Sequence, residues 1–335
     1  MTTLQEVLTN VNPKLRKKIM TGSEVEPIEF ATTPSPNLNK TLNGGFPYGR
    51  QVLVWGNKSS GKSSFCLQMI GEEQAKGKVC AWIDAEMSFD AAWAKSLGVD
   101  VDNLIVSQAR TTNDMVDVAT DLMKSGVDVI IVDSISALLP AVYFEKDSTE
   151  LKQLENTKQI GAEARDMTNA VKMLNYANNQ DKPTLLVLIS QARNNISAMY
   201  TTQQPTGGMA VKFYSSTIIK LFSSESDNQA IKGKIYVGDK IIEEKIGRKV
   251  RWQVQFSKTS PAFQEGEYDF YFRGDVLGVD AIADLADAAE FAGIIEKGGA
   301  WYTIQGERYQ GRANLIAGIR ENLDLQDYIK EQLDG

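Results

Sequence analysis

Apolar side chains along the chain gather in short runs, and the segments between the runs show helical spacing. Runs rich in β-branched residues predict five strands, at residues 51–56, 78–86, 127–134, 184–190 and 216–222. Several of them are apolar nearly throughout, which is typical of strands covered on both faces. Residues 112–125 repeat apolar side chains at helical spacing and predict a helix with Thr112 as its N-cap. This alternation predicts an α/β fold with right-handed βαβ units and a twisted, mostly parallel sheet.

The pattern changes twice in the second half of the chain. After Phe222, the segments KIYVG and KVRWQVQFSK predict antiparallel strands that extend the sheet. After Gly278, helical patterns flank a short hairpin strand, GGAWYTI. We therefore expect an N-terminal segment (1–28), a core (29–277) and a small α/β C-terminal domain (278–335). The polar and partly basic N-terminal segment is either a docking arm or a flexible terminus.

The amino-acid composition restricts the class of protein and the catalytic groups that are available. With 42% hydrophobic and 24% charged residues, the chain has the make-up of a soluble globular protein. It has no apolar run of bilayer length and no secretion-signal pattern at its start, so we expect a cytoplasmic protein without a membrane partner. Cys66 and Cys80 lie in apolar contexts and are expected to be reduced and buried. The chain has no histidine, which excludes histidine-based acid–base catalysis. A net charge of −7 argues only mildly against nucleic acid, because a local basic groove can still bind a strand.

Residues 56–63 match the phosphate-binding P-loop pattern and lie between a predicted buried strand and a predicted helix. The glycines allow backbone N–H groups to turn toward a phosphate at the positive end of the helix. Lys62 is expected to reach the β- and γ-phosphates of ATP, and the Ser63 hydroxyl to bind Mg²⁺. The alternative is a Gly/Ser-rich turn that matches by chance. The predicted nucleotide-binding residues of the loop are Gly56, Asn57, Lys58, Ser59, Ser60, Gly61, Lys62, Ser63 and Ser64.

Two carboxylates follow neighbouring predicted strands. Asp133 ends an apolar strand and is expected to hold Mg²⁺ beside the P-loop; alone, such a residue could also cap a turn. Glu86 lies just past another strand and can polarise the water that attacks a γ-phosphate, although a solvated turn glutamate fits the same pattern. Trp93 could stack on a base or belong to the core.

Together these segments resemble the RecA family of DNA strand-exchange recombinases. The resemblance covers about nine-tenths of the chain. It rests on GNKSSGKSS, on the segment that starts at IDAEMSFDAAW, on SGVDVIIVDSISAL, on SQARNNISAMY with PTGGMAVKFYSS, and on the ending IIEKGGAWYTIQGERYQGRANLIAGIREN. Helicase and clock relatives with the same core lack such an ending. Some features, including the altered loops, are also similar to phage-encoded relatives of the UvsX kind.

The resemblance implies a role for each matching residue in the nucleotide site. Glu86 is then the catalytic carboxylate, and Asp90 and Trp93 contact adenine, with Trp93 in place of the family's usual tyrosine. Gln191 senses the γ-phosphate and couples it to the loop that follows. Lys258 reaches ATP bound to the neighbouring subunit, so Lys62, Glu86, Gln191 and Lys258 form the expected catalytic set.

The resemblance also implies DNA-binding segments near 145–165 and at 192–208. The candidate contacts with a strand are Arg165, Lys172, Arg193, Ile196, Tyr200, Gly207 and Gly208. For the cations the alternative is a solvated surface side chain, and Tyr200 could be an exposed loop tip instead of a stacking residue. Phe213 matches a residue of the subunit interface, which implies a helical filament with residues 1–28 as an oligomerisation arm. In a filament, weak contacts add along one strand, so even an acidic protein can bind DNA.

Besides Trp93, the chain departs from the family pattern at other places. Phe256 replaces a second lysine that would reach the neighbouring nucleotide. The first loop, EKDSTELKQLENTKQ, is long and acidic, which puts its DNA contacts in doubt. Met209 stands where the family has an asparagine. These changes bear on coupling and cooperativity and leave the family assignment intact.

The sequence thus predicts a DNA-dependent ATPase that uses ATP and Mg²⁺, forms filaments on single-stranded DNA and exchanges strands with double-stranded DNA in recombination and repair. A ring-forming motor or helicase with the same core is the first alternative. A scaffold that binds ATP without useful turnover is the second. Loading by single-strand-binding or mediator proteins is left open.

Overall fold

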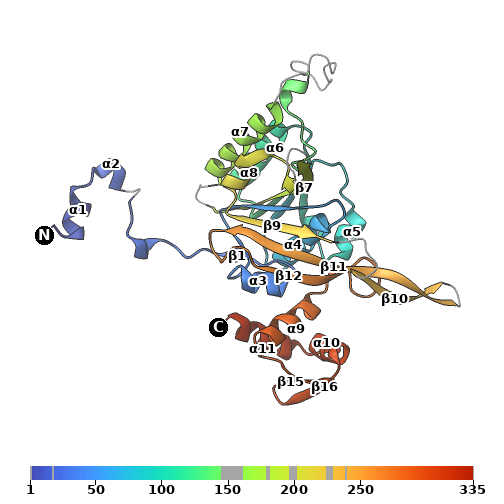
Figure 1. Cartoon of the computed structure of the whole chain (residues 1–335). Coiled ribbons are helices and arrows are strands. Elements are labelled where there is room, and N and C mark those ends of the chain that lie inside the picture. Colours follow the sequence, from blue (N-terminus) through green and yellow to red (C-terminus); the bar gives the residue numbers. More distant parts are fainter. Residues whose placement is uncertain are drawn as a thin grey trace.

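The computed structural model describes residues 2–16, 19–144, 161–178, 182–195, 202–223, 229–237 and 240–334. Its centre is a large twisted sheet in the strand order β13-β12-β11-β9-β3-β7-β6-β4-β5 (Figure 1). The strands from β9 to β5 are parallel, as predicted. These strands are β3 (Gln51–Gly56), β4 (Cys80–Asp84), β5 (Leu104–Gln108), β6 (Val129–Asp133), β7 (Leu185–Asn195) and β9 (Thr217–Phe222).

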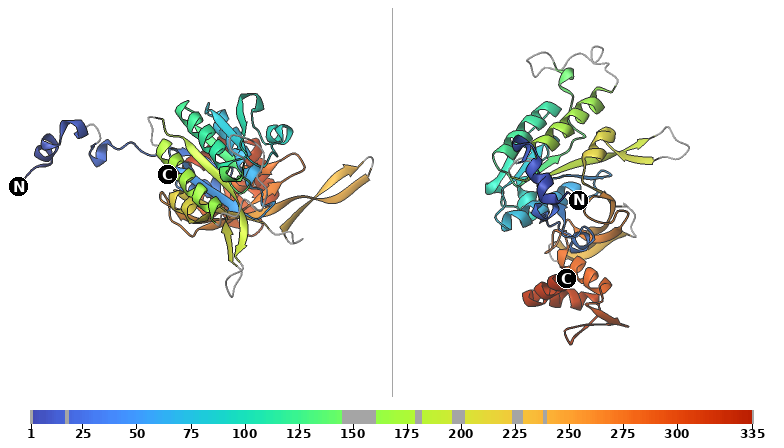
Figure 2. Two further views of the ribbon diagram at one scale, coloured as in Figure 1. Left: turned by 90° about the horizontal axis from the view of Figure 1, so that it is seen from above. Right: turned by 90° about the vertical axis from the view of Figure 1, so that its left-hand side faces the viewer.

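Antiparallel strands extend the sheet beyond β9; the predicted segment KVRWQVQFSK lies in the first of them, whereas the strands at 265–271 and 278–279 were not predicted. They are β11 (Lys240–Ser257), β12 (Glu265–Tyr271) and β13 (Gly278–Val279). The strand β10 (Ala230–Val237) pairs with the first half of β11. The resulting hairpin projects from the body, on the right of Figure 1 and also in the left view of Figure 2.

Helices cover both faces of the sheet, because alternate side chains of each parallel strand point to opposite faces. On one face, α4 (Lys62–Ala75) and α5 (Ala91–Ser96) pack on one apolar cluster. On the other, α6 (Thr112–Lys124), α7 (Ala162–Ala177) and α8 (Gly208–Tyr214) pack on a second. In β6, Val129 and Ile131 belong to the first cluster, whereas Ile130 and Val132 belong to the second. Cys66 and Cys80 are buried free thiols in the first cluster, as expected.

The start of α6 differs from the prediction by one residue. Thr112 is the first helical residue and is buried, and the N-cap is Thr111. The Thr111 hydroxyl accepts a hydrogen bond from the Asp114 N–H (3.0 Å), and the Asp114 carboxylate accepts one from the Thr111 N–H (3.1 Å). This reciprocal capping box places the boundary, because it satisfies two otherwise free N–H groups.

The C-terminal part of the chain forms its own apolar cluster below the sheet in Figure 1. It contains α9 (Ala281–Phe291), α10 (Arg312–Glu321), α11 (Leu323–Asp334) and the small sheet of β14 (Glu296–Gly298), β15 (Trp301–Ile304) and β16 (Glu307–Gln310). At the N-terminus, α1 (Leu4–Asn10) and α2 (Pro13–Arg16) lie away from the body (Figure 2). Within the described ranges, no helix has both the length and the apolar character to cross a membrane.

Shorter elements complete the fold. The strands β1 (Phe30–Ala31) and β2 (Phe46–Pro47) form a small antiparallel pair around α3 (Pro36–Thr41). Single 3-10 turns lie at Gly22–Glu24, Val101–Asn103 and Ala141–Tyr143. The strand β8 (Thr202–Pro205) pairs antiparallel with the end of β7. The segment 192–208, expected as a loop, is therefore in part a two-stranded ribbon.

A buried carboxylate ties the C-terminal cluster to the core. Asp284 of α9 accepts hydrogen bonds from the Ser35 hydroxyl (2.7 Å) and from the Asn37 N–H (2.9 Å) at the start of α3. Its other carboxylate oxygen is buried without a partner among the described residues. Burial raises the pKa of Asp284 from 3.8 to about 7, although the two hydrogen bonds oppose the shift.

We predict that Asp284→Asn changes how stability depends on pH. Because the folded pKa is the higher one, the stability linked to this group is present below pH 3.8 and is lost as the pH rises to about 7. The uncharged amide does not titrate, so the variant does not lose this stability. Above about pH 7 its free energy of unfolding should exceed that of the parent by on the order of 2 kcal/mol. Thermal unfolding on both sides of the window measures the difference. The exposed Asp324→Asn serves as control, and a difference for Asp284→Asn that does not vary with pH would contradict the prediction.

Candidate active site

The P-loop follows β3 directly and has the backbone shape that a phosphate cradle needs. A Cβ on Gly56 would lie 1.8 Å from the carbonyl oxygen of Leu221, so only glycine fits between β3 and β9. Ser59 and Gly61 have positive φ angles of 59° and 83°, which turn the loop tightly before α4 begins at Lys62. The Ser60 hydroxyl is buried and has no hydrogen-bond partner among the described residues. The loop therefore fits the phosphates of a nucleotide.

Lys62 is held at the mouth of this loop. Its side chain is buried, and Nζ donates hydrogen bonds to the carbonyl oxygens of Gly56 (3.2 Å) and Asn57 (2.7 Å). Burial lowers the pKa of Lys62, while the carboxylates of Asp133 and Glu86 oppose that shift. The ammonium group is therefore placed where it can exchange carbonyl partners for phosphate oxygens.

Asp133 ends β6 beside the P-loop and is buried. Burial raises its pKa to about 6, the nearby Ser63 side chain opposes the shift, and Glu86 adds to it. A hydroxyl and a carboxylate are the oxygen donors that Mg²⁺ takes in sites where phosphates complete its coordination. The pair of Ser63 and Asp133 therefore fits such a cation.

Glu86 and Gln191 meet at the carboxyl ends of β4 and β7. The Glu86 Oε1 atom accepts hydrogen bonds from Gln191 Nε2 (2.8 Å) and from the Ser134 hydroxyl. The Gln191 N–H donates to the Ser136 hydroxyl (2.8 Å). The Gln191 carbonyl accepts from the N–H (3.2 Å) and the hydroxyl (3.0 Å) of Thr206. Gln191 thus connects the carboxylate of the nucleotide site with the turn before α8.

The predicted adenine contacts lie at the start of α5. Asp90 is the N-cap of this helix and accepts hydrogen bonds from the N–H groups of Ala92 (2.9 Å) and Trp93 (3.1 Å). Trp93 is partly buried against the first core cluster, and its indole N–H donates to the Ser64 hydroxyl (3.0 Å). The tryptophan therefore joins the first turn of α4 to α5, next to the P-loop.

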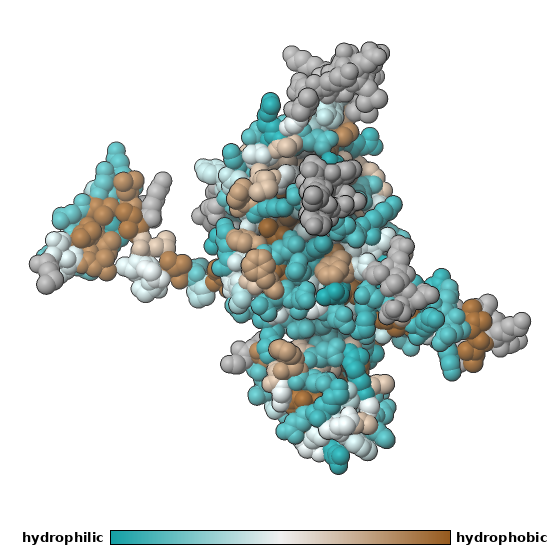
Figure 3. Space-filling view, in the orientation of Figure 1, coloured by the Kyte–Doolittle hydropathy of each residue, from teal (hydrophilic) through white to brown (hydrophobic). Residues whose placement is uncertain are grey.

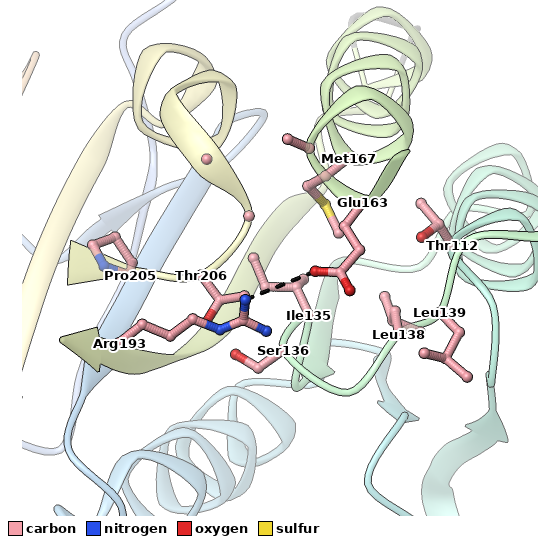
Figure 4. Close-up of a pocket in the computed structure, with 13 residues that line it drawn as sticks. Thr112, Ile135, Ser136, Leu138, Leu139, Glu163, Met167, Arg193, Pro205 and Thr206 are labelled. Atoms are coloured by element: carbon pink, nitrogen blue, oxygen red, sulfur yellow. Dashed lines mark ion pairs between the residues drawn. The ribbon is translucent and has the colours of Figure 1, made fainter. Parts of the chain in front are cut away.

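A second group of predicted residues surrounds a cavity of about 320 Å³ on the other side of β7 (Figure 4). Arg193, Gly207 and Gly208 line it together. Gly207 has a φ angle of 97° and precedes α8. Arg193 forms an ion pair with Glu163, from the first turn of α7, with 3.8 Å between Nη1 and Oε2. The ends of the two segments expected to bind DNA thus line one side of this cavity, and the turn after β6 lines another part of it.

Other predicted residues lie apart from this cavity. Arg165 and Lys172 are exposed on α7 and do not line it. Phe213 is 73% exposed on α8. Lys258 is exposed just after β11, near Phe256 at its end. Ile196 and Tyr200 lie outside the described residues, as does most of the first loop.

Sequence reasoning missed four polar residues of these sites, namely Ser134, Ser136, Thr206 and Glu163. Ser134 and Ser136 follow the strand-end Asp133, and hydroxyls at such a strand end are a weak signal. Thr206 and Glu163 carry no signal in the sequence, because their partners lie 15 and 30 positions away.

Comparison with known proteins gives a consistent result along the chain. The model of the RecA N-terminal domain matches residues 3–278, and that of the RecA C-terminal domain matches residues 283–334. Protein RecA of Marinobacter nauticus is 36% identical over 312 residues, which are 92% of this chain and 83% of that protein. Protein RecA of Acidiphilium cryptum is 34% identical over 315 residues, covering 93% of this chain and 85% of that protein. Protein RecA 1 of Myxococcus xanthus is 34% identical over 327 residues, covering 96% and 89%.

We predict that Gly56→Ala destabilises the protein by at least about 2 kcal/mol, because the new methyl group forces β3 and β9 apart. Nucleotide binding should weaken at the same time, since the loop begins at this residue. Thermal unfolding and binding of a fluorescent ATP analogue measure the two effects. Gly22→Ala is the matched control, because a Cβ there meets no atom within 4 Å. Equal stability of the two variants would contradict the prediction.

Proposed function

This chain belongs to the RecA family of DNA recombinases, and on that premise we propose how its own residues perform the family's work. The protein is a DNA-dependent ATPase that acts in recombination and DNA repair. The match of both RecA domain models, over residues 3–278 and 283–334, carries this conclusion. The C-terminal match also disfavours the ring-forming motor, which has the same core but lacks this domain.

The nucleotide site of this proposal is the P-loop with its two flanking carboxylates. The N–H groups of residues 56–64 receive the phosphates, and Lys62 moves from the carbonyl oxygens of Gly56 and Asn57 to the β- and γ-phosphates. Ser63 and Asp133 hold Mg²⁺, which when bound neutralises charge on the phosphate oxygens. The position of Ser63 in the first turn of α4, near enough to the end of β6 to influence the pKa of Asp133, supports this assignment.

Adenine recognition is assigned to Asp90 and Trp93. The hydrogen bond from the indole N–H to Ser64 fixes the tryptophan ring beside the first turn of the P-loop helix. Asp90 caps α5 through the N–H groups of Ala92 and Trp93, so its carboxylate is held at the same edge of the site. An aromatic face and a carboxylate acceptor suit a purine with an exocyclic amine.

Glu86 is assigned as the group that orients the attacking water. Two donors, Gln191 Nε2 and the Ser134 hydroxyl, hold one oxygen of its carboxylate, which fixes the direction of the side chain. With no histidine in the chain, a carboxylate is the natural acceptor for the proton of that water. Catalysis then needs only positioning and charge stabilisation, to which Lys62 and the neighbouring subunit's copy of Lys258 contribute.

Gln191 and Arg193 carry the proposed coupling between nucleotide and DNA. They lie two residues apart on β7, and in a strand such side chains share one face. Gln191 bonds the nucleotide-site carboxylate with its side chain and the turn before Gly207 with its carbonyl oxygen. A γ-phosphate that draws the Gln191 amide away from Glu86 would therefore shift the ribbon that presents Arg193. Arg165 and Lys172, exposed on α7, are proposed as further contacts with the strand backbone.

In a filament, the exposed apolar residues would be covered by a neighbouring protomer. Phe213 is 73% exposed, and apolar side chains gather on the projecting N-terminal segment in Figure 3. The exposed residues of that segment include Leu4, Val7, Leu15, Met20 and Val25. We assign both surfaces to contacts between protomers. The exposed Phe256 extends the apolar part of such a contact at the position where a second lysine is missing.

The first test is ATP hydrolysis by the full chain with Mg²⁺, with and without long single-stranded DNA. We expect strong stimulation by DNA, and loss of at least about a hundredfold in turnover for Lys62→Ala, because one preorganised charge in such a site contributes on that scale. The exposed Lys95→Ala is the control for the loss of a lysine. ATP binding without stimulation by DNA would remove the proposed coupling, and normal turnover in Lys62→Ala would remove the P-loop assignment.

A second variant isolates the coupling. Gln191→Ala should keep ATP binding, because the P-loop is untouched, but should lose most of the stimulation by DNA. Its ATP affinity and its turnover at saturating DNA separate the two effects. Gln253→Ala, a glutamine of β11 outside the site, is the control. Full stimulation of the Gln191→Ala enzyme would show that another residue transmits the signal.

A further inference from the structure

The ion pair between Arg193 and Glu163 joins the ends of the two segments assigned to DNA. Arg193 extends from the end of β7, and Glu163 extends from the first turn of α7 toward it across the cavity (Figure 4). Their charged atoms are 3.8 Å apart, and both side chains are largely exposed, at 63% and 52%. The carboxylate therefore lies where an incoming anion would meet the guanidinium group.

A guanidinium group binds carboxylates and phosphates through the same fork of N–H donors. A DNA phosphate and the Glu163 carboxylate are therefore alternative partners for Arg193. Once a phosphate is bound, the displaced carboxylate remains close to it, and the two negative charges repel. Both effects disfavour strand binding, and neither requires Glu163 to touch the strand.

The pair is suited to competition because it is weak. At this exposure, water and salt screen the attraction, so a strand can break it at modest cost. The first turn of α7 also keeps Glu163 in place, since a carboxylate is stabilised at the N-terminus of a sixteen-residue helix. Glu163 thus remains near the site whether or not Arg193 is bound to it.

We propose that Glu163 is a determinant of DNA affinity that competes with DNA phosphate for Arg193. The inference rests on the proposed role of Arg193 in strand binding. In the DNA-free protein Arg193 is already paired with Glu163, so one phosphate contact adds little binding free energy. A continuous strand that contacts many protomers is therefore favoured.

The test compares four forms of the full chain: the parent, Glu163→Gln, Arg193→Ala and the double variant. Binding to a fluorescent oligo-dT is followed by anisotropy with a slowly hydrolysed ATP analogue, Mg²⁺ and several NaCl concentrations. Glu163→Gln should tighten binding by about two- to fivefold, the effect of one surface ion pair, and the gain should shrink as salt rises. In the Arg193→Ala background the same change should have a clearly smaller effect, because the competition for Arg193 is gone and only the repulsion of nearby phosphates remains. Glu321→Gln, an exposed glutamate on α10, controls for the change in net charge.

The outcomes separate the inference from the proposed function. Equal tightening in both backgrounds would mean that Glu163 acts through its charge alone, and weaker binding would make it a DNA contact; either result overturns the inference. So does an unchanged affinity. If the parent fails to bind DNA at all, the proposed function itself fails. Thermal unfolding of each variant shows that the fold is intact.

Discussion

The hydrogen-bonded register of four parallel strands is the constraint on which the nucleotide site depends. Gly56 of β3 pairs with Gln191 of β7, and Asp84 of β4 pairs with Asp133 of β6. Because parallel strands end at the same edge of a sheet, this register brings the P-loop, Asp133 and Gln191 to one place. A slip of one residue in any of these pairings would turn the functional side chain to the opposite face. The buried apolar clusters on both sides of the sheet hold the register, so the arrangement of the site depends on the packing of the core.

The same sheet also carries the coupling that we propose between the nucleotide site and Arg193. Most strands end at the edge where the P-loop lies, but β7 continues beyond it to Asn195 and pairs with β8. The extension leaves the buried core and enters solvent within a few residues, since Ile189 is buried and Arg193 is exposed. A strand that is rigid at one end and solvated at the other transmits a small displacement without disturbing the fold. Glu163, the acidic partner of Arg193, lies on α7, so the solvated end of β7 also contacts this helix.

Most of the fold could be read from the sequence, because five of the parallel strands are apolar runs and the P-loop marks its own surroundings. The strand β5 was not predicted. It lies at the sheet edge, and its Ile105 and Val106 are 38% and 43% exposed, so it lacks the uninterrupted apolar pattern. The ribbon of β7 and β8 was expected as a loop, because segment 192–208 resembles the family's second DNA-binding loop. The contacts of Ser134, Thr206 and Glu163 depend on how distant segments meet, which no local pattern records.

The β10–β11 hairpin exposes strand edges that could promote aggregation. Beyond the point where β12 ends its pairing, the hairpin lies free of the body, and among the described strands β10 pairs with β11 alone. Free strand edges of this kind recruit other strands and lead to aggregation. Here charged side chains alternate along the exposed surface, with Lys232, Lys234, Glu243 and Lys245 all exposed. Charged side chains at an exposed edge disfavour the addition of a further strand, so this composition limits amyloid-like stacking of the ribbon.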